Sequence, residues 1–232
     1  MNEKISHEKS YNERALSKRV NPHVMHLPGM DHPHALASSY KAYVANFYHV
    51  SNCDNFDLLK VQAYAQTTDF TCGPASAMAL MHYYGLLSAV DMNVQTEMRI
   101  AHEMGTSEEK GTSPVQIATW LEKNGLSVEL GENGSLAMLR HNLKKGIPTL
   151  VEWMDWGGHW AIATGYDRPN LMQPMQDTIF LADANAHQNN QKNVNGIIPF
   201  NAERFNAMWF DAQYFKPGTI VKGLYITATL PR

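Results

Sequence analysis

The chain has 232 residues, of which 44% are hydrophobic and 18% are charged, and its formal net charge is −3. This composition can bury a sizeable apolar core, unlike that of a disordered chain, and the length suits one substantial domain. The slightly acidic balance offers no basic field for nucleic acid or for an anionic membrane surface, so we expect neither as a partner. The absence of a long apolar run or of a signal peptide predicts a cytoplasmic protein.

Two regions are expected along the chain: an N-terminal arm or extension at 1–35 and one domain at 36–232. The arm carries prolines and charges but no sustained periodicity. It also holds four histidines, namely His23, His26, His32 and His34. Imidazoles with this spacing can share a zinc, copper or nickel ion, which is the alternative to a purely structural arm. Otherwise we expect no metal and no organic cofactor.

The first half of the domain predicts mostly helices. A short helix within 38–50, followed by a strand within 58–64, is expected. Pro74 near the first turn and Gly85 at the end mark a helix that begins at Cys72. Cap residues and helical spacing of apolar residues predict further helices at 93–104, 113–123 and 135–145, with a short strand at 127–130. In the 113–123 helix, Val115, Ala118 and Leu121 are expected to face inward.

The second half predicts mostly strands. Apolar or alternating runs separated by turn residues lie at 147–153, 159–166, 178–182 and 224–230. One helix is expected near 201–209. Helices followed by a mostly antiparallel sheet indicate an α+β fold.

Cys72 has the placement of a catalytic nucleophile. The unpaired N–H groups and the dipole of a helix N-terminus favour a thiolate, which is the reactive form of cysteine. The chain has one other cysteine, Cys53, so a disulfide framework is excluded. A single disulfide between the two cysteines and an inert buried thiol are the alternatives.

His159 and Asp183 are the candidate partners of this thiol. His159 follows Gly157 and Gly158 and begins an apolar strand, where a polar side chain has no packing reason to be. Asp183 ends the 178–182 strand, so antiparallel pairing of the two strands brings both side chains together. The carboxylate would orient the imidazole, and Asn185 is the alternative orienting residue.

Gln66 is the candidate oxyanion donor. An oxyanion hole commonly combines a side-chain amide with the backbone N–H of the nucleophile. Gln66 lies six residues before Cys72, and a turn through Thr67–Asp69 can bring its amide back to the thiol. An ordinary polar loop residue is the alternative interpretation.

Tryptophans and glycines near these residues are candidates for binding the substrate. Trp156 and Gly158 lie directly before His159, and Gly73 follows Cys72. Trp153 and Trp160 flank the same site and could line a cleft or pack in the core. The methionines Met78 and Met81 are interpreted as core residues.

Six segments carry a resemblance to a known family, in the order QTTDFTCGPASAMALMHYYG, GTSPVQIATWLEKNGL, KKGIPTLVEW, GHWAIATGYD, IFLADAN and KGLYITA. Together they resemble the bacterial papain-like cysteine peptidases that process bacteriocin leaders at double-glycine sites, and the free-standing relatives of these enzymes especially. The resemblance implies Cys72 as nucleophile, His159 as base and acid, Asp183 as orienting residue and Gln66 in the oxyanion hole. Thr71 stands where members of the family often have an acidic residue.

The sequence therefore predicts an α+β papain-like fold, in which a helical lobe with the nucleophile helix packs on an antiparallel β-sheet lobe. The predicted function is that of a cysteine peptidase or amidase, which cleaves a peptide or small amide through a thioester on Cys72. One alternative is an acyltransferase or transpeptidase of the phytochelatin-synthase type that uses the same site. The other is a catalytically silent module that binds a peptide.

Overall fold

The computed structural model of the chain describes residues 52, 54–154, 158–185, 196–211 and 218–231. Its helices are α3 (Cys72–Tyr83), α4 (Val94–Met104), α5 (Pro114–Lys123), α6 (Leu136–Lys144), α7 (Ala202–Met208) and the short 3-10 helix η3 (Pro174–Gln176). Every helix expected after position 70 is therefore confirmed. No helix in the described part of the chain is both long and apolar enough to cross a membrane.

The strands are β1 (Phe56–Leu58), β2 (Ser127–Gly131), β3 (Thr149–Trp153), β4 (His159–Asp167), β5 (Thr178–Ala182), β6 (Ile197–Asn201), β7 (Phe210–Asp211), β8 (Val221–Lys222) and β9 (Tyr225–Thr229). Seven of them form one antiparallel sheet in the order β2-β9-β3-β4-β5-β6, with β1 paired to β4. Strands β7 and β8 form a separate two-stranded ribbon. The expected antiparallel sheet is confirmed.

Side-chain caps start four of the helices. Ser113 forms a capping box with Gln116 ahead of α5, and Pro114 is the first residue of that helix, as the sequence indicates. Ser135 caps α6, while Asn93 and Asn201 cap α4 and α7. These caps satisfy backbone N–H groups that a helix leaves unpaired in its first turn.

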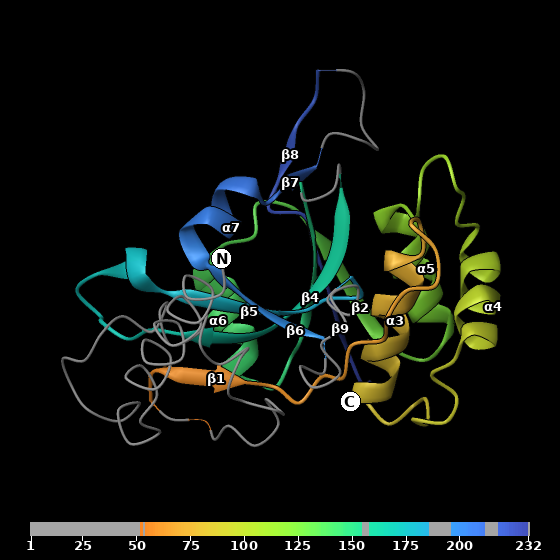
Figure 1. Cartoon of the computed structure of the whole chain (residues 1–232), viewed down its shortest axis with the longest axis horizontal. Helices are drawn as coiled ribbons and strands as arrows, with labels where there is room; N and C mark the ends of the chain where they lie inside the picture. The colour runs from red at the N-terminus through yellow and green to blue at the C-terminus, as the bar shows by residue number, and fades with distance from the viewer. Residues whose placement is uncertain (1–51, 53, 155–157, 186–195, 212–217, 232) are drawn as a thin grey trace, which may run out of the picture.

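Helices cover both faces of the sheet (Figure 1). Helices α3, α4 and α5 pack on one face and enclose a cluster that includes Leu150, Trp160 and Ile162. Helices α6 and α7 pack on the other face against the alternate strand residues, which include Val151 and Trp153. The alternation follows from the period of two residues in a strand, which directs successive side chains to opposite faces.

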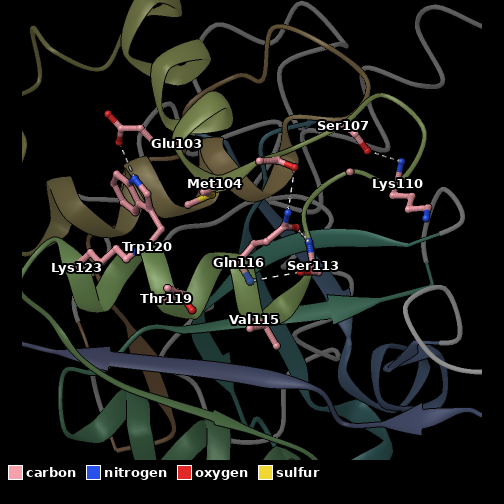
Figure 2. Close-up of a pocket in the computed structure, with 12 residues that line it drawn as sticks. Glu103, Met104, Ser107, Lys110, Ser113, Val115, Gln116, Thr119, Trp120 and Lys123 are labelled. Atoms are coloured by element: carbon pink, nitrogen blue, oxygen red, sulfur yellow. Dashed lines mark hydrogen bonds between the residues drawn. The ribbon is translucent and has the colours of Figure 1, made fainter.

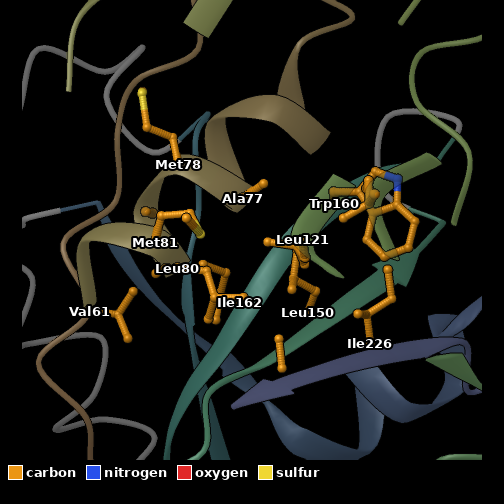
Figure 3. Packing of buried hydrophobic residues seen from close by; sticks show 14 of the residues in the cluster. Val61, Ala77, Met78, Leu80, Met81, Leu121, Leu150, Trp160, Ile162 and Ile226 are labelled. Atoms are coloured by element: carbon orange, nitrogen blue, oxygen red, sulfur yellow. The ribbon is translucent and has the colours of Figure 1, made fainter. Parts of the chain in front are cut away.

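Helix α3 is the central helix of the fold, because all of its residues from Cys72 to Met81 are buried. Figure 3 shows the side chains of Met78, Leu80 and Met81 on this helix, and all three belong to the cluster that also contains Ile162 and Leu150 of the sheet. Full burial of one such side chain stabilises the fold by about 1.5–3 kcal/mol. The interpretation of both methionines as core residues is confirmed, with exposures of 0% for Met78 and 7% for Met81.

Two expectations for local structure are wrong, and one strand was missed. The strand expected at 58–64 is wrong, because pairing with β4 ends at Leu58 in β1. On this edge of β4, β1 pairs with residues 165–167, and residues 159–163 are already paired with β3. Val115 is 63% exposed, since it lies two residues from Ile117 and so about 200° around the helix from that buried side chain. Strand β6 was not predicted from the sequence; it contains Pro199 and lies at the edge of the sheet, where proline is tolerated.

Candidate active site

Cys72 is the first residue of α3 and a free thiol, and only 8% of its surface is exposed. The N-cap residue is Thr71, whose side chain makes no capping hydrogen bond to the first turn. Pro74 fits this turn because it has no N–H group to satisfy. The thiol therefore lies beside backbone N–H groups that no cap side chain occupies, in the positive field of the helix N-terminus.

His159 and Asp183 meet at the ends of two paired strands. Strands β4 and β5 are antiparallel neighbours, as the sequence predicts. His159 Nε2 donates a hydrogen bond to Asp183 Oδ1 at 2.8 Å, and both side chains are buried. The backbone N–H of Asn185 also donates to Asp183 Oδ1, at 2.7 Å, and so helps to fix the carboxylate. Asp183 is therefore the residue in contact with the imidazole, and the backbone of Asn185 supports the Asp183 carboxylate.

The imidazole of His159 also interacts with the thiol of Cys72, strongly enough to shift the pKa of the imidazole. Because Nε2 is engaged by Asp183, the ring nitrogen left for the thiol is Nδ1. Burial by itself would lower the pKa of His159, but the hydrogen bonds and charges of Asp183 and Cys72 raise it to about 10. This environment favours an imidazolium, which is the state that stabilises a neighbouring thiolate.

Gln66 lies beside the end of β5. Its backbone N–H donates to the carbonyl oxygen of Ala184 at 3.2 Å, next to Asp183 in the chain. Its side-chain Nε2 donates to the carbonyl oxygen of Thr68 at 2.7 Å, which leaves one of the two amide hydrogens for another acceptor. Its Oε1 is buried and accepts no hydrogen bond from a described residue.

Two buried carboxyl groups near the site were missed by the sequence reasoning. Glu152 on β3 is 1% exposed and interacts with the carboxyl group of Asp211 on β7. Burial, followed by the charge of Asp211, raises the pKa of Glu152 to about 9, and the electrostatic influence of Cys72 and His159 also reaches this group. The available signal was the position of Glu152 inside the apolar run 147–153.

Glu97 on α4 is the second buried carboxyl group that was missed, and it is 0% exposed. It binds Thr67 and Thr71, which lie between Gln66 and Cys72. The signal in the sequence was its spacing, because Glu97 shares one stripe of α4 with the buried residues Ile100, Ala101 and Met104.

The residues expected to bind substrate are placed only in part. Gly73 packs so closely on Thr112 that a Cβ atom there would lie 2.9 Å from the Cβ of Thr112. Gly158 has φ 118°, a conformation that favours glycine just before His159. Trp156 lies outside the described residues, as do the four histidines of the arm. A role in binding stays a prediction for these residues.

Trp153 and Trp160 are core residues, with exposures of 2% and 1%. They occupy opposite faces of the sheet, since Trp160 belongs to the cluster under α3 and Trp153 to the cluster under α6 and α7. Trp160 also donates from Nε1 to the carbonyl oxygen of Thr112 at 2.9 Å. Of the two roles that the sequence allowed, the structure supports packing.

A hollow of about 540 Å³ lies on the helical side of the molecule, between the end of α4, the turn at 107–111 and α5 (Figure 2). Its wall includes Trp120, whose Nε1 donates to Glu103 at 2.8 Å, and the capping pair Ser113 and Gln116. Cys72, His159, Asp183 and Gln66 are not among the residues that line it. The candidate catalytic residues are therefore assigned by their mutual contacts and not by this hollow.

A helix that begins at a cysteine and packs on an antiparallel sheet bearing a histidine and an aspartate defines the papain-like cysteine peptidase fold. Residues 58–214 match the model of the Peptidase_C39 like family. The chain belongs to this family and is a cysteine peptidase.

Solved structures share this fold. The peptidase domain of Streptococcus ComA, a bi-functional ABC transporter involved in a quorum sensing pathway, is 15% identical with a TM-score of 0.51, over 74% of this chain and 99% of that domain. A putative C39-like peptidase from Bacillus anthracis is 13% identical with a TM-score of 0.53, over 77% of this chain and 99% of that one. At these identities the likeness concerns the fold. Among curated proteins none is significantly similar in sequence.

Proposed function

We propose that the protein hydrolyses a peptide or small amide through a thioester on Cys72, with His159 as acid and base and Asp183 as the residue that orients the imidazole. The observation that carries this proposal is the 2.8 Å hydrogen bond between His159 and Asp183, together with the interaction of the same imidazole with the thiol of Cys72 at the start of α3. Such an arrangement activates a thiol and holds a proton ready for a leaving group.

Acylation begins with attack of the Cys72 thiolate on the carbonyl carbon of the substrate. A C–S bond forms, and the electron pair of the C=O bond moves onto oxygen. The tetrahedral intermediate then collapses, its C–N bond breaks, and the proton of the His159 imidazolium passes to the leaving nitrogen. The products of this half-reaction are an amine and a thioester, with the imidazole neutral.

The amide of Gln66 and the backbone N–H of Cys72 are the proposed donors to the oxyanion. Because Nε2 of Gln66 uses one hydrogen for Thr68, the amide is held in one orientation while its second hydrogen stays available. Donors fixed in advance stabilise the developing charge without the cost of reorganising.

Deacylation uses the same imidazole as a base. Neutral His159 takes a proton from water, the oxygen of that water attacks the thioester carbon, and the C–S bond breaks. The carboxylic acid leaves, and Cys72 and His159 return to the thiolate and imidazolium. Asp183 keeps the ring oriented throughout and stabilises its positive charge through the 2.8 Å hydrogen bond.

Cleavage of a proteome-derived peptide library, with new termini read by mass spectrometry, tests the proposal without a known substrate. We expect cleavage by the parent protein and none by Cys72→Ala or His159→Ala, because both steps need these side chains. Asp183→Asn is expected to reduce cleavage strongly, since an amide can disturb the tautomer of the ring. Gln66→Ala is expected to lower kcat by about 100-fold or more, as removal of one oxyanion donor does.

The matched control is Ser88→Ala, because among the described residues the Ser88 hydroxyl forms hydrogen bonds only with Asp91, in an exposed loop. It should cleave like the parent. Cleavage that survives Cys72→Ala in a purified sample would contradict the thioester mechanism. A parent protein that binds peptides from the library without cleaving them would support the silent binding module instead.

A further inference from the structure

Glu97 is a carboxylate on the inner stripe of a helix. It shares this stripe of α4 with Ile100, Ala101 and Met104, and it is fully buried. A buried carboxylate costs free energy unless hydrogen bonds compensate it, so its partners show what it holds. Those partners come from the segment between Gln66 and Cys72.

The contacts of Glu97 are directed to two threonines. Its Oε1 accepts from the backbone N–H of Thr67 at 2.8 Å and from the Thr71 hydroxyl at 2.6 Å. Its Oε2 accepts from the hydroxyl of Thr67. Hydrogen bonds to an ionised acceptor are shorter and about twice as strong as those between neutral groups.

These two threonines are the neighbours of the proposed oxyanion donors. Thr67 follows Gln66, and Thr71 precedes Cys72. One carboxylate therefore holds both ends of the segment 67–71, which joins Gln66 to the helix N-terminus.

The hydroxyl of Thr71 shows how completely this turn is ordered. Its one hydrogen goes to Glu97, while its oxygen accepts from the backbone N–H of Thr68 at 3.3 Å and from the Thr68 hydroxyl at 3.0 Å. The N-cap side chain is thus used inside the turn and makes no capping bond to α3. The backbone N–H of Cys72 has no competing acceptor from its own cap.

We propose that Glu97 is the positioning residue of the oxyanion-hole turn at 66–72: by binding Thr67 and Thr71 together, its carboxylate fixes the separation between the Gln66 amide and the Cys72 backbone N–H. This inference rests on the proposed function for its catalytic consequence. The anchoring of the turn rests on the contacts of Glu97 alone. Glu97 touches neither the substrate nor the thiol, and acts through the two donors.

The first test is the substitution Glu97→Leu, which keeps the size of the side chain and suits the apolar stripe but removes every acceptor. On the best-cleaved peptide of the library, we expect kcat to fall about 10-fold to 100-fold while KM stays within about threefold, because an oxyanion hole acts on the transition state. Glu97→Gln keeps one acceptor oxygen without the charge and should retain an intermediate kcat. The matched control is Glu103→Leu. Glu103 lies on the same helix, but its carboxylate accepts a hydrogen bond from Trp120 and does not contact the turn.

The second test approaches the same contact from its other partner, which matters if Glu97→Leu does not fold. Thr71→Val removes the hydroxyl and keeps the shape of the side chain, whereas Thr71→Ser keeps the hydroxyl. We expect Thr71→Val to lower kcat as Glu97→Leu does, and Thr71→Ser to keep most of the kcat of the parent. The double variant should lose less than the product of the two single losses, because both remove the same contact.

Alkylation of Cys72 by iodoacetamide separates positioning from general damage. This reaction forms no oxyanion, so its rate and pH profile should be the same in Glu97→Leu and the parent. A loss of alkylation parallel to the loss of kcat would overturn the proposal, because the whole helix N-terminus would then be disturbed. A kcat within about twofold of the parent in both Glu97→Leu and Thr71→Val would overturn it as well.

Hydrogen exchange of the 66–72 segment tests the anchoring in the absence of any substrate. Exchange should be faster in Glu97→Leu, where the N–H of Thr67 loses its acceptor, and unchanged in Glu103→Leu. Unchanged exchange in Glu97→Leu overturns the inference even if the parent is an active peptidase. If the parent cleaves no peptide but exchange is still faster in Glu97→Leu than in the parent, the anchoring of the turn is supported. In that case only the proposed hydrolysis has failed.

Discussion

Ser76 on α3 donates a hydrogen bond from its hydroxyl to the carbonyl oxygen of Trp160 on β4, at 3.2 Å. Ser76 lies one helical turn after Cys72, and Trp160 directly follows His159. The bond therefore ties the helix of the proposed nucleophile to the strand of the proposed base, close to both side chains. Since Ser76 is 3% exposed, this contact is shielded from water.

We expect Ser76→Ala to lower the free energy of unfolding by about 1–2 kcal/mol, because it removes a buried hydrogen bond. A small displacement of α3 along β4 should also lower kcat/KM, by up to about tenfold. Urea unfolding and steady-state kinetics measure the two effects. Ser88→Ala, which removes an exposed hydroxyl, is the control and should change neither. Parent-like stability of Ser76→Ala would show that the contact contributes nothing.

Gly73→Ala is expected to destabilise the protein despite the higher helix propensity of alanine. The new Cβ would lie 2.9 Å from the Cβ and Oγ1 of Thr112 and 3.1 Å from Ile117, so a neighbour must move. Overpacking of this kind costs about 1–3 kcal/mol, whereas the gain in helix propensity is at most about 1 kcal/mol. Because residue 73 follows the proposed nucleophile, activity should fall too.

Thermal unfolding of Gly73→Ala and of the double variant Gly73→Ala with Thr112→Gly checks this reasoning. The cost of the alanine should be smaller when Thr112 is replaced by glycine, because the nearest side-chain atoms are then absent. Equal costs in both backgrounds would mean that the close approach of Thr112 does not determine the effect.

The sequence predicts the helices well because their ends carry local signals. Ser113 with Pro114 marks the start of α5, and Ser135 marks the start of α6, whatever the tertiary structure around them. Strand β6 and the paired ribbon β7–β8 have no such local signal. Their existence depends on neighbours distant in the sequence, which periodicity does not reveal.

In the candidate site, too, residues with a local sequence signal could be predicted, and residues that depend on distant partners could not. Cys72, His159 and Asp183 could be proposed from the sequence because each is a polar residue at the end of a regular element. Glu97 and Glu152 could not, since their importance comes from partners on other elements, Thr71 and Asp211. The one sequence signal for both residues was a glutamate at a position where the pattern predicts a buried apolar side chain.

The raised pKa of His159 predicts a particular pH dependence of stability. The folded protein holds the proton of this imidazole up to about pH 10, whereas an unfolded histidine loses it near pH 6.5. The stabilisation by protonated His159 is therefore complete below about pH 6.5 and is lost as the pH rises towards 10. We expect the advantage of the parent over His159→Gln in unfolding free energy to shrink across this range, by about 1–3 kcal/mol.

Urea unfolding of both proteins at pH 6, 8 and 10 gives the comparison. Asp183→Asn should weaken the dependence, because it removes the carboxylate that raises the pKa of His159. A difference between the parent and His159→Gln that stays constant over this range would contradict an imidazolium in the folded state.

The buried pair of Glu152 and Asp211 predicts a stabilising substitution. Burial and the neighbouring carboxylate raise the pKa of Glu152 to about 9, so the folded protein keeps a proton that the unfolded chain loses near pH 4.5. The stability from this protonated group is complete below about pH 4.5 and is lost as the pH rises towards 9. Glu152→Gln has no such loss and can still donate to Asp211. It should be more stable than the parent at pH 8 by about 1–3 kcal/mol, and less different at pH 5.

Thermal unfolding at pH 5 and pH 8 tests the sign, and Glu103→Gln is the control with the opposite sign. The hydrogen bond from Trp120 lowers the pKa of Glu103 in the folded protein. The stability that ionised Glu103 contributes is therefore present above its pKa in the unfolded chain and is lost as the pH falls through its pKa in the folded protein. Glu103→Gln should therefore be less stable than the parent at pH 8. If Glu152→Gln were also destabilised at pH 8, Glu152 would be charged in the folded protein, which would contradict its raised pKa.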